Sequence, residues 1–490
     1  MAPSQPPSAT RVLVWFRSDL RTTDNTALSR ACADPKAEIV GLFVVTPDEW
    51  RRHDVAPVRV EFILRTLREL SASLGAIGIP LRIVDSPSAD ATPRLVVETA
   101  AALGCAQIFA NREHEVNESR RDELAATLAR AHGIGFTLTT DQVSVEPDSI
   151  RTGEGRFYTV FTPFKKAWSR ALVAGGGPIC HPRPARRAAV SVKSDPVPGA
   201  VSGFASGVDP ALWPAGERAA LARLDAFVAD GIRGYKLNRD FPARAGTSSL
   251  SPYLAVGAIS PRMCIAAAMS ANRGSATPLE SGDEHALCWI SELCWREFYV
   301  HVLVGFPRVC MGRAFQPQTE RLAWSGNEEH LEAWKNGKTG IPIVDAGMRQ
   351  LLATGWMHNR VRMITAMFLS KNLFISWREG ERHFMRHLID GYFASNNGGW
   401  QWSASTGTEA APYFRIFNPT TQGKKFDPDG DYVRAYVPEL RGLSGNEIHE
   451  PQTLPPMARA RVEYPEPIVD LGESRDRAIA AFQHLRTLPG

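Results

Sequence analysis

The residue types in the segment 390–426 suit a pocket that binds a flat, polar ring system. The Asn-Asn-Gly-Gly run at 396–399 has a composition that breaks a helix and lets the backbone approach a planar or charged group. Trp400 and Trp402 follow, and Tyr413 and Arg415 come after a run of hydroxyl residues. Rings among amides and a guanidinium can stack a flat ligand and hydrogen-bond its edges. A Trp-x-Trp pair alone would indicate a packed loop, but these neighbours favour a binding pocket.

A helix expected over 283–303 carries a second group of chemically active side chains. Glu292, Trp295, Arg296 and Tyr299 stand at i, i+3, i+4 and i+7, and therefore share one face. The alternative is a surface ion pair between Glu292 and Arg296 beside a half-buried indole. A carboxylate, an indole and a guanidinium together are unusual for a core stripe, so this face is a candidate binding surface.

A further helix, expected over 359–373, begins with polar residues of the same kind. Asn359, Arg362 and Met363 share one side of it, and Arg360 lies a step around. An ordinary helix end is the alternative. Upstream, the run 246–262 offers hydroxyls and backbone amides next to a helix start, which suits phosphate oxygens. Such Ser/Thr clusters also occur as plain caps and turns.

Basic residues interleaved with aromatic ones provide a candidate nucleic-acid surface. Cations can hold phosphates while apolar walls stack an extruded base. A solvated charged face is the alternative. The basic candidates are Arg239, Arg360, Arg415, Lys424 and Lys425, and the apolar walls are Trp295 and Trp402.

Two kinds of architecture must position these residues. Strands are expected at 11–17, 38–45, 81–84 and 107–110, and helices at 25–33, 58–74 and 94–103. This alternation predicts an α/β domain over 11–140, built on a doubly wound parallel sheet. Its first strand is not followed by GxGxxG, so a dinucleotide site there is unsupported.

The rest of the chain is expected to be a connector followed by an all-helical domain. Pro and Gly residues crowd the connector at 141–215, where one helix is expected at 164–173. From 216 to 490 only helical periodicity remains, which indicates a change of domain. Helices are expected at 217–230, 261–271, 283–303, 328–336, 343–355, 359–373 and 378–389.

The composition is that of an ordinary globular protein. The 490 residues are 44% hydrophobic and 22% charged, with a formal net charge of +4 that is too small to prove a nucleic-acid partner. The seven cysteines show no regular spacing, which indicates reduced thiols and no metal site. The first ten residues have no apolar signal core, and no run is long enough to span a membrane. We therefore expect a cytoplasmic protein.

The segment 390–426 closely resembles the flavin-binding region of the photolyase and cryptochrome family, in particular class I photolyases of cyclobutane pyrimidine dimers. WFRSDLRTTDN at 15–25 resembles the family's N-terminal domain. TSSLSPYLAVGAIS at 247–260 resembles the segment that holds the FAD pyrophosphate. HNRVRM at 358–363 has the form of cyclobutane-dimer photolyases, whereas (6-4) photolyases and animal cryptochromes carry histidines at the Asn359 and Met363 positions.

The resemblance implies roles for many residues of this chain. Those at the damaged bases would be Glu292, Trp295, Asn359 and Met363. An electron relay from the surface to FAD would use Trp324, Trp377 and Trp400 in that order. FAD would be held by Tyr235, Thr247, Ser248, Ser249, Leu250, Ser251, Arg362, Asp390, Gly391, Tyr392 and Asn396, with Asp390 paired to Arg362. DNA would be contacted by Arg239, Trp295, Arg296, Asn359, Arg360, Trp402 and Arg415.

Two positions depart from the family pattern. Tyr392 stands where most relatives have an acidic residue, which puts one polar contact to the flavin edge in doubt. Asn117 and Glu118 match the pair that binds methenyltetrahydrofolate, the antenna chromophore of folate-type relatives, but Met311 replaces the lysine that accompanies it. We expect this antenna, bound more weakly than usual, or another one.

The function implied by the resemblance is light-driven repair of cyclobutane pyrimidine dimers in DNA. Electron transfer from excited, reduced FAD would split the dimer, the protein supplying position and electrostatics. The enzyme is expected to be a monomer without an obligate protein partner. A cryptochrome-type blue-light receptor, which binds FAD without repair, is the alternative. A generic flavin oxidoreductase lacks an NAD(P)H fingerprint here.

Overall fold

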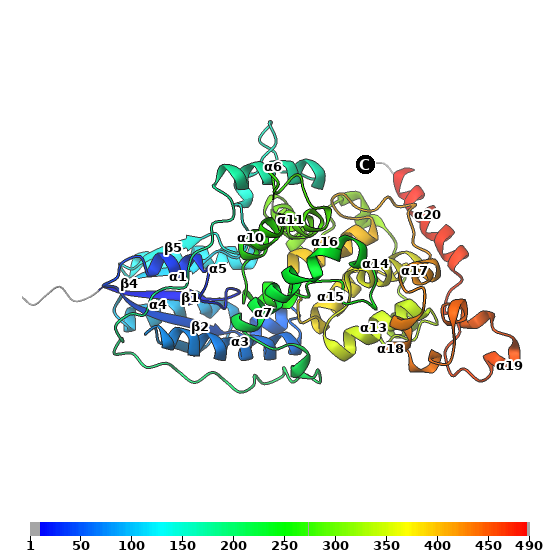
Figure 1. The fold of residues 1–490 in the computed structure, drawn as a ribbon, viewed down its shortest axis with the longest axis horizontal. Helices are drawn as coiled ribbons and strands as arrows, with labels where there is room; N and C mark the ends of the chain where they lie inside the picture. The colour runs from blue at the N-terminus through cyan, green and yellow to red at the C-terminus, as the bar shows by residue number, and fades with distance from the viewer. Residues whose placement is uncertain (1–9, 273, 488–490) are drawn as a thin grey trace, which may run out of the picture.

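The structure, a computed structural model, describes residues 10–272 and 274–487. The Pro- and Ser-rich start of the chain, at 1–9, lies outside the described residues. A sheet with its helices forms one end of the elongated molecule, and helices alone form the other (Figure 1). Within the described part of the chain, no helix has the length and apolar character needed to cross a bilayer.

The N-terminal part is a five-stranded, all-parallel sheet of order β3-β2-β1-β4-β5. The strands are β1 (Arg11–Phe16), β2 (Glu38–Val45), β3 (Leu81–Asp85), β4 (Cys105–Asn111) and β5 (Gly135–Thr139). The helices are α1 (Thr26–Ala31), α2 (Pro47–Arg52), α3 (Pro57–Ala76), α4 (Thr92–Ala102) and α5 (Val116–Ala131). Strand β1 buries Val14 with α1 and α3 on one face and Leu13 with α4 and α5 on the other. The prediction of a doubly wound sheet is confirmed.

The connector binds the edge of this sheet. After α6 (Phe161–Ala174) it runs without long helices to residue 216. The backbone N–H of Asp195 donates to the carbonyl of Leu81 (2.9 Å), and its carboxylate accepts from the N–H of Ile83 (2.9 Å). The connector therefore satisfies backbone groups of the edge strand β3.

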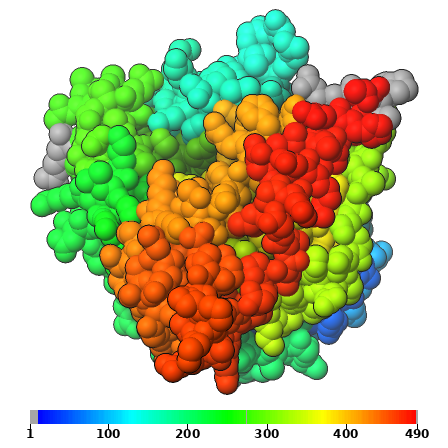
Figure 2. Space-filling model, turned by 90° about the vertical axis from the view of Figure 1, so that its right-hand side faces the viewer, coloured from blue at the N-terminus to red at the C-terminus, as the bar shows by residue number. Residues whose placement is uncertain are grey.

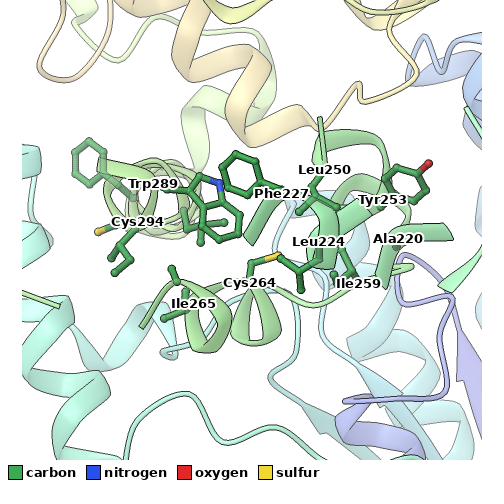
Figure 3. Packing of buried hydrophobic residues seen from close by; sticks show 14 of the residues in the cluster. Ala220, Leu224, Phe227, Leu250, Tyr253, Ile259, Cys264, Ile265, Trp289 and Cys294 are labelled. Atoms are coloured by element: carbon green, nitrogen blue, oxygen red, sulfur yellow. The ribbon is translucent and has the colours of Figure 1, made fainter. Parts of the chain in front are cut away.

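The C-terminal part is helical, as predicted. The helices are α7 (Glu217–Ala229), α8 (Tyr235–Asn238), α9 (Ser251–Val256), α10 (Pro261–Ala271), α11 (Glu284–Gly305), α12 (Glu328–Lys335), α13 (Pro342–Thr354), α14 (Asn359–Met367), α15 (Trp377–His387), α16 (Phe393–Ala404), α17 (Pro419–Phe426), α18 (Asp431–Tyr436), α19 (Pro456–Arg459) and α20 (Leu471–Thr487). A buried core joins α7, α9, α10 and α11, in which Phe227 packs edge to face against Trp289 with 4.7 Å between ring centroids (Figure 3).

One local prediction was wrong. The Asn-Asn-Gly-Gly run at 396–399 does not break a helix, because α16 passes through it. A Cβ added at Gly398 would lie 2.1 Å from the ring of Tyr299 on α11. Glycine at this position therefore permits two helices to pack closely, and this packing outweighs the poor helix propensity of the run.

A π-helix at Phe368–Asn372 follows α14 and contains a fully buried lysine. The ammonium of Lys371 donates to Ser405 Oγ (2.8 Å) and lies 3.8 Å from the ring centroid of Phe482 on α20. Burial lowers the pKa of Lys371 to about 7.

A buried charged network joins the two parts of the molecule. Arg262 on α10 donates to Asp141 (2.8 Å) and Asp24 (3.1 Å), which follow β5 and precede α1. Arg21 also pairs with Asp141 (2.5 Å), and Ser260 Oγ donates to Asp24. Burial raises the pKa of Asp141, but the two arginines lower it more, so the net shift is downward. The carboxylate of Asp141 is therefore charged and paired with two arginines inside the molecule.

Candidate functional site

Three neighbouring helices of the C-terminal part each leave one face incompletely covered. Helices α11 and α14 both contact α16, yet side chains between them remain accessible. These are Glu292, Trp295, Arg296 and Tyr299 on α11, Asn359, Arg360, Arg362 and Met363 on α14, and Ser395, Asn396 and Gly399 on α16. The molecular surface is hollowed between the green, cyan and orange parts of the chain (Figure 2). These residues therefore keep some exposed surface, although Arg296 turns to the side of the N-terminal part.

Glu292 belongs to a chain of alternating charges. Arg239 donates to the Glu292 carboxylate, and Arg360 donates to Asp240 (2.8 Å), whose carboxylate lies 3.9 Å from Arg239 Nε. Burial lowers the pKa of Arg239, but the hydrogen bond and charge of Glu292 raise it more. The guanidinium groups of Arg239 and Arg360 therefore alternate with the carboxylates of Glu292 and Asp240. Asp240 was missed because nothing in the sequence pairs it with Arg360.

The ring of Trp295 forms an aromatic wall whose orientation is fixed by a neighbouring ring. Its ring stacks on Phe161 of α6, with 3.7 Å between centroids and 7° between planes. Tyr299 lies 5.7 Å away on the same face. Phe161 also escaped prediction, because it comes from the connector. Phe161 covers one face of the Trp295 indole and fixes the plane of the ring. The indole keeps some exposed surface that another flat ring can contact.

Arg296 does not lie with the other arginines of the expected DNA surface. It donates to the carbonyl of Gln142 (2.5 Å), and its guanidinium lies 4.5 Å from the ring centroid of Tyr392. Both contacts engage the cation within the chain, on the side of the N-terminal part.

The other residues expected at DNA are dispersed. Arg415 is exposed, and among the described residues no ion pair engages it. Lys424 pairs with Glu450, whereas Lys425 and Arg360 lie 5.1 and 4.4 Å from the ring centroid of Phe426. Trp402 is partly exposed at the end of α16. Arg239 and Arg360 therefore lie beside Glu292 and Asp240, and Arg360 and Lys425 lie beside the ring of Phe426.

The residues present fit a flavin nucleotide. Arg362 donates to both oxygens of Asp390 (2.8 and 3.1 Å), which confirms the expected pair. A Cβ added at Gly399 would meet no atom within 4 Å, although this glycine lies inside a helix. The side chain of Asn396, on the same face of α16, donates to the carbonyl of Glu381 (3.0 Å). A charged pair, a fixed amide and a glycine that faces open space are groups that suit a flat, polar ring.

A row of hydroxyl groups precedes α9. Thr247, Ser248 and Ser249 are partly exposed and Ser251 is exposed, whereas Leu250 is buried beneath them. Ser249 has a φ of 49°, which turns the chain sharply. Tyr235 on α8 is buried in the core that supports this row. Accessible hydroxyls and amides of this kind can hold phosphate oxygens.

The three tryptophans of the expected relay belong to one apolar cluster. Trp377 and Trp400 are buried, and Trp324 is partly exposed and lies 5.1 Å from Phe374, centroid to centroid. A Cβ added at Gly380 on α15 would meet the Trp400 ring at 2.0 Å, so this ring packs on the helix that begins with Trp377. Trp324 is the one of the three that is partly exposed, as the surface end of such a path requires.

A cavity of about 530 Å³ lies between the two parts of the chain. This interdomain cavity is lined by Asn117, Glu118, Met311, Gly391 and Tyr392, among others. Met311 is 56% exposed. The structure therefore brings the expected antenna pair together with two residues expected at the flavin.

On one side of the interdomain cavity, acidic residues and a histidine lie close together. His53 lies 3.2 Å from the amide nitrogen of Asn117 and 3.4 Å from Glu118. Glu49, His53 and Glu118 have ligand atoms within 4.8 Å of one another. Burial, and then the charges of Glu118 and Glu113, raise the pKa of Glu115 above its usual value. A carboxyl group that keeps its proton can both donate and accept hydrogen bonds.

Comparison with known proteins shows which family this chain is similar to. A family model described as DNA photolyase matches residues 12–186, and one described as the FAD binding domain of DNA photolyase matches 289–484. A deoxyribodipyrimidine photo-lyase of Escherichia coli is 45% identical over 476 residues, 97% of this chain and 98% of the relative. One of Neurospora crassa is 40% identical, covering 96% of this chain and 81% of the relative.

Solved structures agree with these relatives. A class III photolyase from Agrobacterium tumefaciens superposes with a TM-score of 0.87 at 33% identity, covering 100% of both chains. An archaeal photolyase from Sulfolobus tokodaii with two FAD molecules gives 0.79 at 29% identity, covering 97% of this chain and 100% of that one. The match thus includes the sheet, the helical part and the surfaces between them, and the chain belongs to the DNA photolyase family.

Proposed function

We infer that the protein repairs cyclobutane pyrimidine dimers in DNA with the energy of light, as a deoxyribodipyrimidine photo-lyase. The observation that carries this function is the set of photo-lyases that match it along nearly its whole length at 40–45% identity. The paired charges of Glu292 and Arg239 beside the wall of Trp295 supply a place for a damaged base. A cryptochrome-type receptor is not favoured, because the relatives that match nearly the whole chain at 40–45% identity are named deoxyribodipyrimidine photo-lyases.

We propose that FAD lies between α11, α14 and α16, with its phosphates at the hydroxyl row 247–251 and with Tyr235, Arg362, Asp390 and Asn396 around it. When bound and reduced, FAD supplies the electron that splits the dimer. The protein positions the partners and excludes water, and it needs no covalent nucleophile. The indoles of Trp400, Trp377 and Trp324 supply oxidisable groups on a path toward the surface.

The lesion would enter as an extruded pair of bases. Extrusion is less costly for a dimer than for normal bases, because the dimer pairs and stacks poorly. We propose that Trp295 stacks against it, that Asn359 and Met363 contact it, and that Glu292 exchanges its bond to Arg239 for one to a damaged base. Arg239, Arg360, Arg415 and Trp402 would hold the flanking strand.

We propose that the interdomain cavity holds the antenna chromophore, methenyltetrahydrofolate. Its volume and the pair Asn117 and Glu118 in its wall support this proposal. Met311 offers no cation there, so any anionic tail depends on arginines of the same wall, such as Arg52 and Arg382. We also propose that the protein is cytoplasmic, in agreement with seven unpaired cysteines, and that it is a monomer.

The test of the function is repair of a defined thymine cyclobutane dimer in a short oligonucleotide. Reduced enzyme is compared in blue light and in the dark, with an oligonucleotide that carries a (6-4) lesion alongside. We expect light-dependent loss of the cyclobutane dimer alone. Absence of repair by protein that binds FAD and photoreduces it would overturn the assignment in favour of a receptor.

A further inference from the structure

Asp240 is an acidic residue that lies between two of the arginines expected at DNA. It follows Arg239, which ends α8, and it reaches Arg360 in the first turn of α14. Arg360 donates to the Asp240 carboxylate (2.8 Å), and Arg239 Nε lies 3.9 Å from the same oxygen. Asp240 therefore links segments that are 120 residues apart in the chain.

The backbone on both sides of Asp240 is fixed by hydrogen bonds. The N–H of Arg239 donates to the carbonyl of Tyr235 (2.8 Å), and the N–H of Phe241 donates to the carbonyl of Asn238 (3.1 Å). The chain itself thus holds the Asp240 carboxylate beside the Arg239 guanidinium. A group that is fixed in this way needs little further ordering when a ligand binds.

The two carboxylates of this charged group are more exposed than its two cations. The side chains of Glu292 and Asp240 are 33% and 32% exposed, whereas those of Arg239 and Arg360 are 17% and 18% exposed. A nucleic acid that approaches therefore meets the carboxylates first. Carboxylates repel phosphate groups but accept hydrogen bonds from the N–H groups of bases. The group therefore suits extruded bases better than an intact backbone.

Arg239 competes with any damaged base for Glu292, because its guanidinium already donates to the Glu292 carboxylate. Releasing Glu292 would be unfavourable if the guanidinium were left without a partner. Within the described part of the chain, Asp240 is the one other acid in ion-pair range of that guanidinium. A carboxylate can accept from more than one guanidinium, so Asp240 can pair with Arg239 and keep Arg360.

We propose that Asp240 is a positioning residue that takes over Arg239 when Glu292 turns to a damaged base. This inference rests on the proposed function and on the role of Glu292 in it. Undamaged DNA keeps its bases stacked and does not reach Glu292, so it gains nothing from the exchange and is repelled by Asp240. Asp240 therefore helps the protein to distinguish damaged from undamaged DNA.

The test is binding of two duplexes of one sequence, with and without a thymine cyclobutane dimer. Full-length protein that carries FAD is titrated in the dark, and fluorescence anisotropy gives both affinities. Asp240→Asn removes the charge but keeps the size of the side chain and an oxygen acceptor for Arg360. We expect the affinity for dimer DNA to fall about fivefold and the affinity for undamaged DNA to rise about threefold. Binding of undamaged DNA should also depend more steeply on salt, by about 0.9 in log K per unit of log[salt].

Glu38→Gln is the matched control for the loss of one negative charge. Glu38 pairs with Arg11 (2.6 Å) on the sheet and is 35% exposed, so its exposure is close to that of Asp240. This control should leave both affinities unchanged. In a Glu292→Gln background, Asp240→Asn should no longer lower the affinity for dimer DNA, whereas a purely structural role of Asp240 would still lower it.

The outcomes separate this inference from the proposed function. Equal losses for the two duplexes, no change in either, or a full effect of Asp240→Asn without Glu292 would refute the exchange, while dimer repair by the wild type would stand. The same gain for undamaged DNA in Glu38→Gln would also refute it, because overall charge would then be the cause. A wild type that neither prefers nor repairs dimer DNA would overturn the proposed function too.

Discussion

Gly399 offers a sharp test of where the flavin lies. It sits inside α16 on the same face as Asn396, and a methyl group added to it would meet nothing within 4 Å. Replacing an interior helical glycine by alanine stabilises the helix by ~1 kcal/mol. In flavin-free protein of 490 residues, Gly399→Ala should therefore raise Tm by about 1 °C. The same methyl would occupy space needed by a flavin ring, so we expect FAD affinity to fall at least about tenfold, a loss of ~1.4 kcal/mol.

The adjoining glycine is the comparison. A methyl at Gly398 would lie 2.1 Å from the ring of Tyr299, so Gly398→Ala should destabilise the flavin-free protein by about 1–3 kcal/mol. Thermal unfolding followed by circular dichroism measures the first effect, and titration with FAD followed by flavin fluorescence measures the second. A stabilised Gly399→Ala variant that binds FAD like the wild type would refute the proposed flavin position. A destabilised one would refute the open space itself.

Three other measurements test the lesion site, the electron relay and the buried lysine separately. Glu292→Ala should lower the quantum yield of dimer repair while FAD stays bound, and unchanged repair would remove Glu292 from the mechanism. Trp377→Phe should block photoreduction of oxidised FAD yet spare repair by pre-reduced enzyme; wild-type photoreduction would contradict the relay. Lys371 has a folded pKa of about 7 and an unfolded one of 10.5, so the unfolded chain binds more protons in between and stability should rise with pH over this window, by up to about 1.4 kcal/mol per unit. Lys371→Met should flatten that rise in urea unfolding at about pH 7 and about pH 9, and an unchanged slope would exclude Lys371 as its source.

The sheet could be predicted where strands are buried on both faces. EIVGLFVV at 38–45 became β2 without a change of bounds, because a central parallel strand is apolar throughout. The elements α5 and β5 were missed. Helix α5 buries only Asp122, Ala125 and Ala129, so it has almost no apolar stripe. Strand β5 lies at the edge of the sheet, where burial is incomplete.

Within the site, spacing predicted what lies on one helix and missed what arrives from elsewhere. The common face of Glu292, Trp295 and Tyr299 followed from helical periodicity. Phe161 behind Trp295, and Asp240 beside Arg360, depend on contacts between distant segments. The helix through Gly398 was missed for the same reason, since the ring of Tyr299 that requires a glycine there comes from another helix.

The charged network around Arg262 limits how this chain can be divided or recombined. An isolated N-terminal fragment would keep Asp24 and Asp141 but lose Arg262, their cation from the helical half. Breaking a buried ion pair by removing one partner is strongly destabilising, by about 3–5 kcal/mol. The halves are therefore poor candidates for expression as separate fragments. An exchange of segments with a relative must therefore keep Arg21, Asp24, Asp141 and Arg262 together.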